Sequence, residues 1–109
     1  MPDTIETLLK RNLHEVFGER DDKKRREAIA QLWTEDCLFI DHSGKSRGHD
    51  ELDRAVAVLH QRLPGYVFNE LRTVDLLHES GRLAWSYSPP GQVSIKGVDV
   101  VLVRDAHLR

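Results

Sequence analysis

Apolar residues recur at helical spacing in three segments of the first half of the chain. The first segment covers residues 4–17, where an i, i+3, i+4 stripe ends at Gly18, a typical helix stop. Its apolar members are Ile5, Leu8, Leu9, Leu13, Val16 and Phe17. The polar residue Asn12 lies one turn from Leu8 and Leu9 and therefore points to the same side of the predicted helix.

Two more helices are predicted before the Pro64-Gly65 breaker. One has an acidic start at residues 21–22, a charged solvent-facing stretch and a short apolar stripe of Ile29, Leu32 and Trp33. The other follows residues 48–50 and ends at the breaker. Its stripe consists of Leu52, Ala55, Val56, Leu59 and Leu63.

Alternating patterns predict strands in the rest of the chain. Residues 37–41 form a short strand that places Cys37, Phe39 and Asp41 on one face, and residues 42–45 have turn chemistry. After residue 65 the chain favours strands at 66–78, 82–88 and 93–104, with turn signals at 79–81, 89–91 and 105–107. In the second of these strands, Trp85 and Tyr87 share a face.

This order of elements is α+β. It predicts three N-terminal helices packed on a curved, mainly antiparallel sheet, which together form a cone-shaped barrel. The last long strand is apolar on both faces near its centre. One face can cover the helices and a pocket, but Val98, Val100 and Leu102 on the other face need a second cover. A second subunit is the simplest cover, so we predict a homodimer through this face.

Composition narrows the possible functions. The 109 residues, 12.5 kDa in mass, suffice for one domain spanning residues 1–109. Sixteen Lys and Arg residues against eighteen Asp and Glu give a net charge of −2, which provides no electrostatic surface for nucleic acid. The single cysteine, Cys37, excludes an intrachain disulfide and a thiolate zinc cluster. The acidic N-terminus and the lack of a long apolar run predict a cytoplasmic protein without a membrane span.

Three local strings, in their order and spacing, resemble the nuclear transport factor 2 superfamily, in its SnoaL-like and ketosteroid isomerase-like branch. They are residues 32–37 (LWTEDC) leading into 39–41 (FID), residues 48–52 (GHDEL) and residues 97–105 (GVDVVLVRD). The resemblance covers nearly the whole chain and implies a cone-shaped α+β barrel with a pocket between the helices and the concave sheet face. The family continues through one more strand after a turn like the one at residue 105, so either the sheet lacks its last strand or the chain is truncated.

The resemblance also implies roles for individual residues. In the isomerase branch a carboxylate at the end of the first strand shuttles a proton, and Asp41 stands at that position. A second carboxyl group, on a late strand, donates a hydrogen bond to the developing oxyanion, and Asp99 matches it. Asn12 stands where that branch has a tyrosine, which is a departure from ketosteroid isomerases. Fold alone does not transfer a function, because the family includes isomerases, cyclases, hydrolases, dehydratases and non-catalytic domains.

The residues themselves leave alternatives open. Asp99 lies between valines and is costly to bury in ionised form, so it is either a pocket carboxyl group or an edge-strand charge that opposes aggregation. Asp41 precedes a turn and is either a base or an ordinary turn residue. Asn12 can donate to a substrate oxygen or bond a neighbouring backbone group.

Apolar and aromatic side chains are expected to form the pocket wall. The candidates are Trp33, Phe39, Val56, Leu59, Trp85, Tyr87 and Val101. The six histidines show no metal-ligand spacing, and neither a phosphate-binding loop nor a nucleophile elbow occurs, so we expect no metal and no cofactor. His42 neighbours Asp41 but points to the opposite strand face.

Three functions fit these observations. The leading hypothesis is a small enzyme of the isomerase, cyclase or hydratase type that binds a small apolar molecule and transfers a proton without a cofactor. In it, Asp41 is the base and Asp99 the acid or hydrogen-bond donor. The alternatives are a non-catalytic small-molecule binder that uses the same pocket and a dimerisation or association module.

Overall fold

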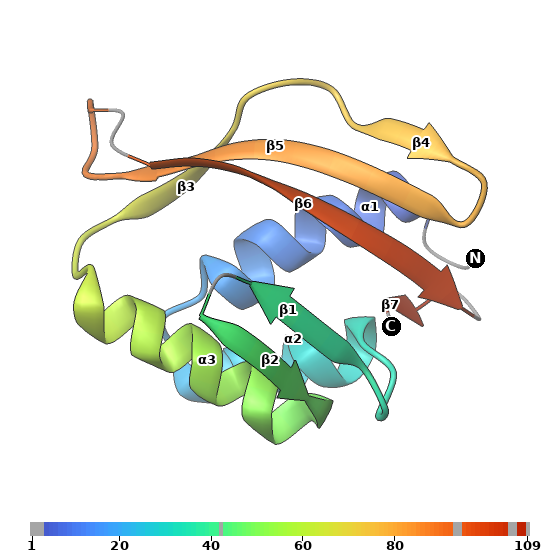
Figure 1. Ribbon diagram of the computed structural model, residues 1–109. Helices are drawn as coiled ribbons and strands as arrows, with labels where there is room; N and C mark the ends of the chain where they lie inside the picture. The colour runs from blue at the N-terminus through green and yellow to red at the C-terminus, as the bar shows by residue number, and fades with distance from the viewer. Residues whose placement is uncertain (1–3, 42, 93–94, 105–106, 109) are drawn as a thin grey trace.

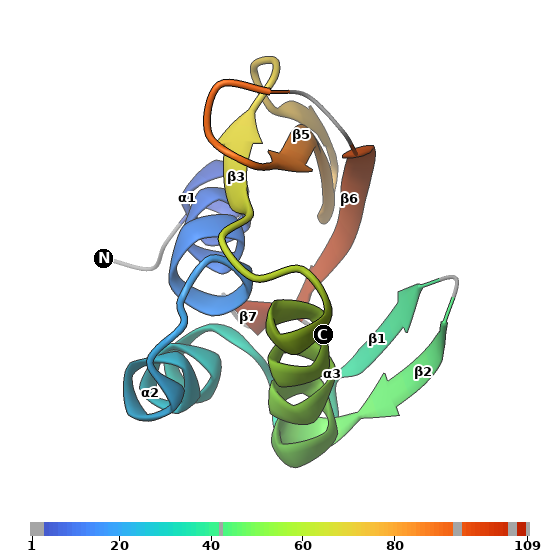
Figure 2. The ribbon, with the colours of Figure 1, turned by 90° about the vertical axis from the view of Figure 1, so that its left-hand side faces the viewer.

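The computed structural model describes residues 4–41, 43–92, 95–104 and 107–108. As predicted, the helices pack against one face of a strongly curled antiparallel sheet, which forms a half-barrel (Figures 1 and 2). The helical segments are α1 (Ile5–Arg11), η1 (Asn12–Phe17), α2 (Asp22–Leu32) and α3 (Gly48–Arg62). The strands are β1 (Leu38–Asp41), β2 (Gly44–Arg47), β3 (Val67–Glu70), β4 (Asp75–Leu77), β5 (Ser80–Ser88), β6 (Ile95–Arg104) and β7 (His107–Leu108).

Local structure departs from the sequence prediction in three places. The first predicted helix continues from α1 into a π-helix, η1, in which the Gly18 N–H donates to the Leu13 carbonyl at 2.8 Å. The predicted turn after β1 opens directly into β2, which pairs with β1 as a hairpin. The long strand predicted at 66–78 is two short strands, β3 and β4, which both pair with β5. Residues 42, 93–94 and 105–106, which belong to a predicted turn, strand end and turn, lie outside the described residues.

The main sheet has the strand order β3-β5-β6-β7, with β4 also on β5. Strand β5 runs antiparallel to β6 in a register that pairs Trp85 with Gly97 and Leu83 with Asp99. The two-residue β7 pairs with the end of β6, and its Leu108 carbonyl accepts a hydrogen bond from the Thr34 N–H at 2.7 Å. This contact ties the end of the sheet to the segment between α2 and β1.

A glycine allows α1 to lie directly on β5. A Cβ atom at Gly81 would stand 2.6 Å from Ile5 Cγ2 and 2.8 Å from Leu9 Cδ1, closer than side chains can pack. Leu8, Leu9 and Leu83 are essentially inaccessible to solvent. The core draws on residues of α1, η1, α2 and α3 on the helical side and of β5, β6 and β7 on the sheet side.

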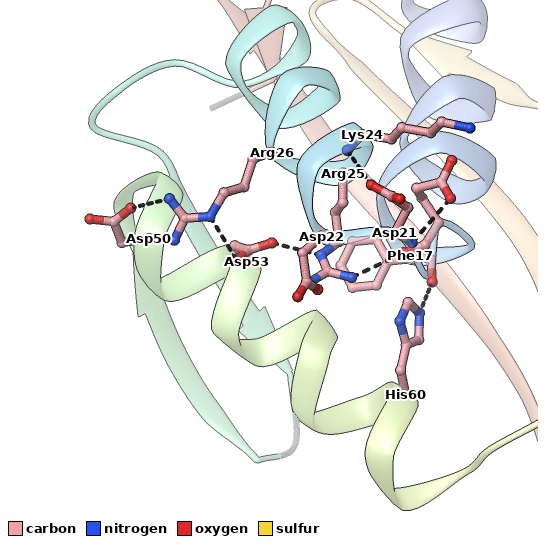
Figure 3. A network of polar contacts seen from close by, with 10 residues as sticks. Phe17, Asp21, Asp22, Lys24, Arg25, Arg26, Asp50, Asp53 and His60 are labelled. Atoms are coloured by element: carbon pink, nitrogen blue, oxygen red, sulfur yellow. Dashed lines mark hydrogen bonds and ion pairs between the residues drawn. The ribbon is translucent and has the colours of Figure 1, made fainter.

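A buried arginine joins α2 to α3 (Figure 3). Only 1% of Arg25 is exposed, and its Nε donates to Asp53 Oδ1 at 2.6 Å. The same guanidinium donates to Asp22 and, at 3.1 Å, to the Glu19 carbonyl. Arg26 donates to the second Asp53 oxygen at 3.1 Å, so both oxygens of this carboxylate bind α2. A buried charge is tolerated only with such partners.

A second polar contact joins α3 to the end of η1. The His60 side chain is buried, and its Nε2 lies 2.6 Å from the Phe17 carbonyl oxygen (Figure 3). Because a carbonyl only accepts, Nε2 carries the proton in this bond. Burial lowers the pKa of His60 below its ordinary value, chiefly through desolvation.

The outer face of the sheet exposes apolar side chains. Val98, Val100 and Leu102 of β6 are 49%, 68% and 54% exposed, as the alternation along this strand predicts. Arg82, the register partner of Val100, forms an ion pair with Asp75 at 2.8 Å beside them. In the described part of the chain, no helix is long and apolar enough to cross a membrane.

Candidate functional site

A cleft of about 520 Å³ opens between β6, the β1–β2 hairpin and the start of η1. Figure 2 shows the β1–β2 hairpin standing apart from the main sheet, beside α3. Its polar lining residues are Asn12, Asp36, Arg47, Asp99 and Arg104. Its apolar lining comes from Trp33, from residues 38–40 of β1 and from valines and a leucine of β6. The cleft lining thus combines apolar and polar groups in comparable proportion.

Trp33 fixes the orientation of Asn12. The Trp33 indole N–H donates to Asn12 Oδ1 at 2.9 Å, and both side chains are buried. An indole only donates, so the amide oxygen must face it and the amide NH₂ group is left to donate elsewhere. Among the described residues no acceptor takes this NH₂ group, and Asn12 lines the cleft. Asn12 therefore offers a hydrogen-bond donor to a ligand.

The π-helical turn begins at Asn12. Asn12, Leu13, Val16 and Phe17 are all buried, so four of the six residues of η1 face the interior. Single π-helical turns occur frequently at functional sites. The sequence pattern identified the inward direction of Asn12 but contained no signal for the change of helix type.

Trp85 holds Asp99 in a matching way. The Trp85 indole N–H donates to Asp99 Oδ1 at 3.0 Å, across the β5–β6 ladder. Gly97 stands directly opposite Trp85, and a Cβ there would lie only 2.4 Å from a carbon of the indole ring. The ring can therefore lie over the backbone of β6 and reach Asp99, two residues further along the same face.

The surroundings of Asp99 favour its uncharged form. Asp99 lines the cleft together with Val101, which lies two residues further along the same face of β6. Burial raises the pKa of Asp99 above its ordinary value, and the hydrogen bond from Trp85 offsets only part of this effect. Asp99 thus keeps its proton to higher pH than an exposed aspartate does, and in that form it donates a hydrogen bond.

Asp41 lies in a different environment. It is the last residue of β1, it is exposed, and its Oδ1 accepts hydrogen bonds from the backbone N–H groups of Ser43 at 2.8 Å and Gly44 at 3.2 Å. It shares a strand face with Phe39 but is nearer the hairpin tip, outside the residues that line the cleft. The structure therefore places the two predicted carboxyl groups in unlike surroundings and does not bring both into the cleft lining. His42 lies outside the described residues.

The predicted wall residues divide into two groups. Trp33, Phe39 and Val101 line the cleft, and Trp85 reaches it through Asp99. Val56 is fully buried in the core, and Leu59 packs against that core. Neither of these two α3 residues lines the cleft. Tyr87 stacks on Phe68 with ring centroids 4.0 Å apart.

Two arginines of the lining were missed at the sequence level. Arg104 donates to Asp36 Oδ1 at 2.6 Å, which joins the end of β6 to the segment before β1. Arg47 ends β2 and caps α3. The segment GKSR (residues 44–47) was interpreted partly as a turn because it has no apolar alternation. The sequence therefore did not predict the side of the strand on which Arg47 lies. Ile40 and Leu38 complete this side of the cleft.

Metal-binding side chains do not cluster in the described part of the chain. In the described ranges no cluster of three His, Cys, Asp or Glu side chains has such a geometry. Cys37 is buried and free, and desolvation raises the pKa of its thiol, which makes it a poor nucleophile.

Comparison with known proteins finds relatives by structure. No protein-family model matches the chain, and no curated protein matches it. The chain is similar to a proposed isomerase of the SnoaL-like family from Agrobacterium tumefaciens strain C58, with 26% identity, a TM-score of 0.87 and coverage of 94% of this chain and 88% of the other.

Two further solved structures share the fold. A proposed SnoaL-like polyketide cyclase from Jannaschia sp. CCS1 has 16% identity and a TM-score of 0.76, with coverage of 97% and 83%. An LEH-like epoxide hydrolase from M. tuberculosis has 11% identity and a TM-score of 0.67, with coverage of 95% and 76%. The helices and the curled sheet have the fold of the nuclear transport factor 2 superfamily, and the similarity to the Agrobacterium protein supports its SnoaL-like branch.

Proposed function

We propose that the protein binds a small, largely apolar molecule in this cleft and that two hydrogen-bond donors, Asn12 and protonated Asp99, hold one oxygen atom of the ligand. The observation that carries the proposal is the pair of indole contacts. Trp33 and Trp85 each occupy one atom of a cleft-lining polar side chain and leave the other polar atom available. Donors fixed in advance stabilise a developing oxyanion without reorganisation.

The chemistry that this arrangement supports is proton transfer next to a carbonyl group. A base removes a proton from the neighbouring carbon, and the electron pair moves onto the oxygen held by Asn12 and Asp99. The proton then returns to the carbon skeleton, so no cofactor is consumed. Asp41 is the proposed base. It acts from the tip of the β1–β2 hairpin, so the reacting carbon has to lie at the mouth of the cleft, on the Phe39 face of β1.

Deuterium exchange tests this function without knowledge of the substrate. A panel of small ketones and unsaturated ketones is incubated with the protein in D2O, and loss of the C–H signal next to the carbonyl is followed by NMR. General acid–base catalysis contributes about 10²-fold or more, so Asp99→Leu and Asp41→Asn should lower the exchange rate by that amount. Asp50→Asn, on an exposed surface pair with Arg26, is the matched control and should exchange normally.

The variants also separate the roles. Asp99→Asn keeps an acceptor for Trp85 and a donor for the ligand but removes the acidic proton, so it should bind ligands as the unchanged protein does. If no ketone exchanges while ligands still bind through Asn12 and Asp99, the protein is a binder and the catalytic proposal is wrong.

For the outer sheet face we propose a second copy of the chain as the partner. The face carries Val98, Val100 and Leu102 beside the oppositely charged Asp75 and Arg82. A two-fold axis can place the Arg82 side chain of one copy against the Asp75 side chain of the other, so the face is complementary to itself in charge. Val100→Lys should then yield a monomer in analytical ultracentrifugation.

The matched control for the dimer is Val58→Lys, since Val58 is an apolar residue of α3 that is 38% exposed. It should leave the oligomeric state unchanged. A monomer in the unsubstituted protein at micromolar concentration would exclude the dimer.

A further inference from the structure

We propose that the ligand of this cleft is an organic acid whose carboxylate binds Arg47 at the cleft mouth while its carbonyl or hydroxyl oxygen lies between Asn12 and Asp99. This inference rests on the proposed function, because it adds a second contact point for the same ligand. The substrate class then becomes a small keto or hydroxy acid with an apolar body.

Arg47 lines the cleft with a guanidinium group that no carboxylate of the described residues pairs with. It is the last residue of β2, the register partner of Leu38, and it lines the cleft. Its backbone N–H donates to Glu51 Oε1 at 2.9 Å, so the acidic side chain of the first turn of α3 is engaged by the backbone. Across the residues that the structure describes, no carboxylate pairs with the Arg47 guanidinium.

The other ionisable residues of the cleft lining have partners within the protein. Arg104 and Asp36 bind each other at 2.6 Å. Asp99 accepts from Trp85, and desolvation raises its pKa, which favours the uncharged carboxyl group. The Arg47 guanidinium is a lining charge that forms no ion pair within the described residues. A guanidinium binds a carboxylate through two parallel N–H···O bonds, so this position favours an anionic group of that shape.

The apolar lining defines the rest of the ligand. Phe39 and Ile40 of β1 and Val101 of β6 belong to the cleft together with both the donor pair and Arg47. A ligand that reaches from Arg47 to Asn12 therefore contacts apolar side chains along its body. The cleft volume of about 520 Å³ is in the range of pockets that hold small organic molecules.

Matched acids and amides test this inference. The probes are 4-oxo-4-phenylbutanoate and its primary amide, together with homologues that have one to three additional methylene groups. Binding is measured from the two indole N–H resonances in ¹⁵N-labelled protein. The chain has only two tryptophans, Trp33 and Trp85, and each is bonded to one of the polar groups that would hold the ligand.

We expect the best acid to bind about fivefold or more tightly than its amide, since a partly exposed ion pair contributes about that factor. Arg47→Gln should remove this preference, because it weakens binding of the acid and leaves binding of the amide unchanged. Arg54→Gln is the matched control, because Arg54 is an exposed arginine of α3 that does not line the cleft. It should keep the preference.

Failure of this inference is distinguishable from failure of the proposed function. If acids and amides bind equally, or if Arg47→Gln leaves their ratio unchanged, the acid-binding role is wrong while the donor pair stands. If no member of either series shifts the indole resonances, the donor pair and the acid-binding role both fail.

Discussion

Replacing Gly97 with alanine should separate Trp85 from Asp99. An added Cβ would lie 2.4 and 2.5 Å from two carbons of the indole ring, and atoms in real proteins do not approach so closely. The backbone at Gly97 is part of a ten-residue strand that pairs along β5, so the ring has to move instead. When it moves, its N–H loses the 3.0 Å contact with Asp99 Oδ1.

The cost can be worked out from three terms. Forcing a methyl group into a packed contact costs about 1–3 kcal/mol. Loss of the indole hydrogen bond adds about 1 kcal/mol. Replacing glycine within a strand returns about 0.5–1 kcal/mol, because alanine loses less conformational freedom on folding. The free energy of unfolding of Gly97→Ala should therefore fall by about 1–3 kcal/mol.

Urea unfolding measures this change, and the indole resonances locate it. The Trp85 N–H signal should shift toward the position of an indole without a carboxyl partner, while the Trp33 signal stays in place. Lys96→Ala is the control, because Lys96 is the neighbouring residue and its exposed side chain points to the other face. Its unfolding free energy should change by less than about 0.5 kcal/mol.

One result would refute the reasoning. If Gly97→Ala is as stable as the unsubstituted protein and its Trp85 signal is unmoved, the indole does not lie over Gly97. The orientation of Asp99 then has another cause, and the donor role of this carboxyl group loses its structural basis.

Three more predictions concern charge. The raised pKa of Asp99 means that the folded state keeps a proton that the unfolded chain has already released. The free energy of unfolding should therefore fall as pH rises from the ordinary aspartate pKa to that of Asp99, by at most about 1.4 kcal/mol per pH unit. In urea unfolding, the midpoints of Asp99→Asn should lack this dependence on pH. Asp53→Asn leaves the buried Arg25 short of a counter-charge and should cost about 3 kcal/mol in urea unfolding, whereas Asp50→Asn on the exposed pair with α2 should cost almost nothing. The lowered pKa of His60 means that the unfolded chain binds the proton first, so stability should fall as pH drops below the ordinary histidine pKa, and thermal scans of His60→Gln should lack this loss.

The elements with strong periodicity could be predicted from the sequence. The stripes of the first, second and third helices, and the alternation of β5 and β6, each need only local spacing to be recognised. The segment GKSR has no such spacing, and β2 exists because β1 supplies its hydrogen-bond partners. The side of β2 on which Arg47 lies depends on that pairing, so the residues near Arg47 in the chain did not predict it.

The two predicted carboxyl groups differ for the same reason. Asp41 precedes a turn, and its hydrogen bonds to the N–H groups of Ser43 and Gly44 follow from neighbours two and three residues away. The neighbouring residues were thus sufficient to predict that Asp41 stabilises the turn. The partner of Asp99 stands on another strand, fourteen residues away, and a pattern along one strand does not identify it.

The contact between Trp85 and Asp99 nevertheless follows from the sequence once the strand register is known. The register pairs Trp85 with Gly97, and strand alternation puts Asp99 on the same face as Gly97. A side chain at position 97 would block the indole, so the glycine and the aspartate two residues later form one unit with the tryptophan across the ladder. Trp33 and Asn12 repeat this arrangement between two helical segments and make the second donor of the cleft. The two side chains of the proposed donor pair are therefore oriented by the fold itself, which is the condition under which a hydrogen bond to a developing charge lowers a barrier.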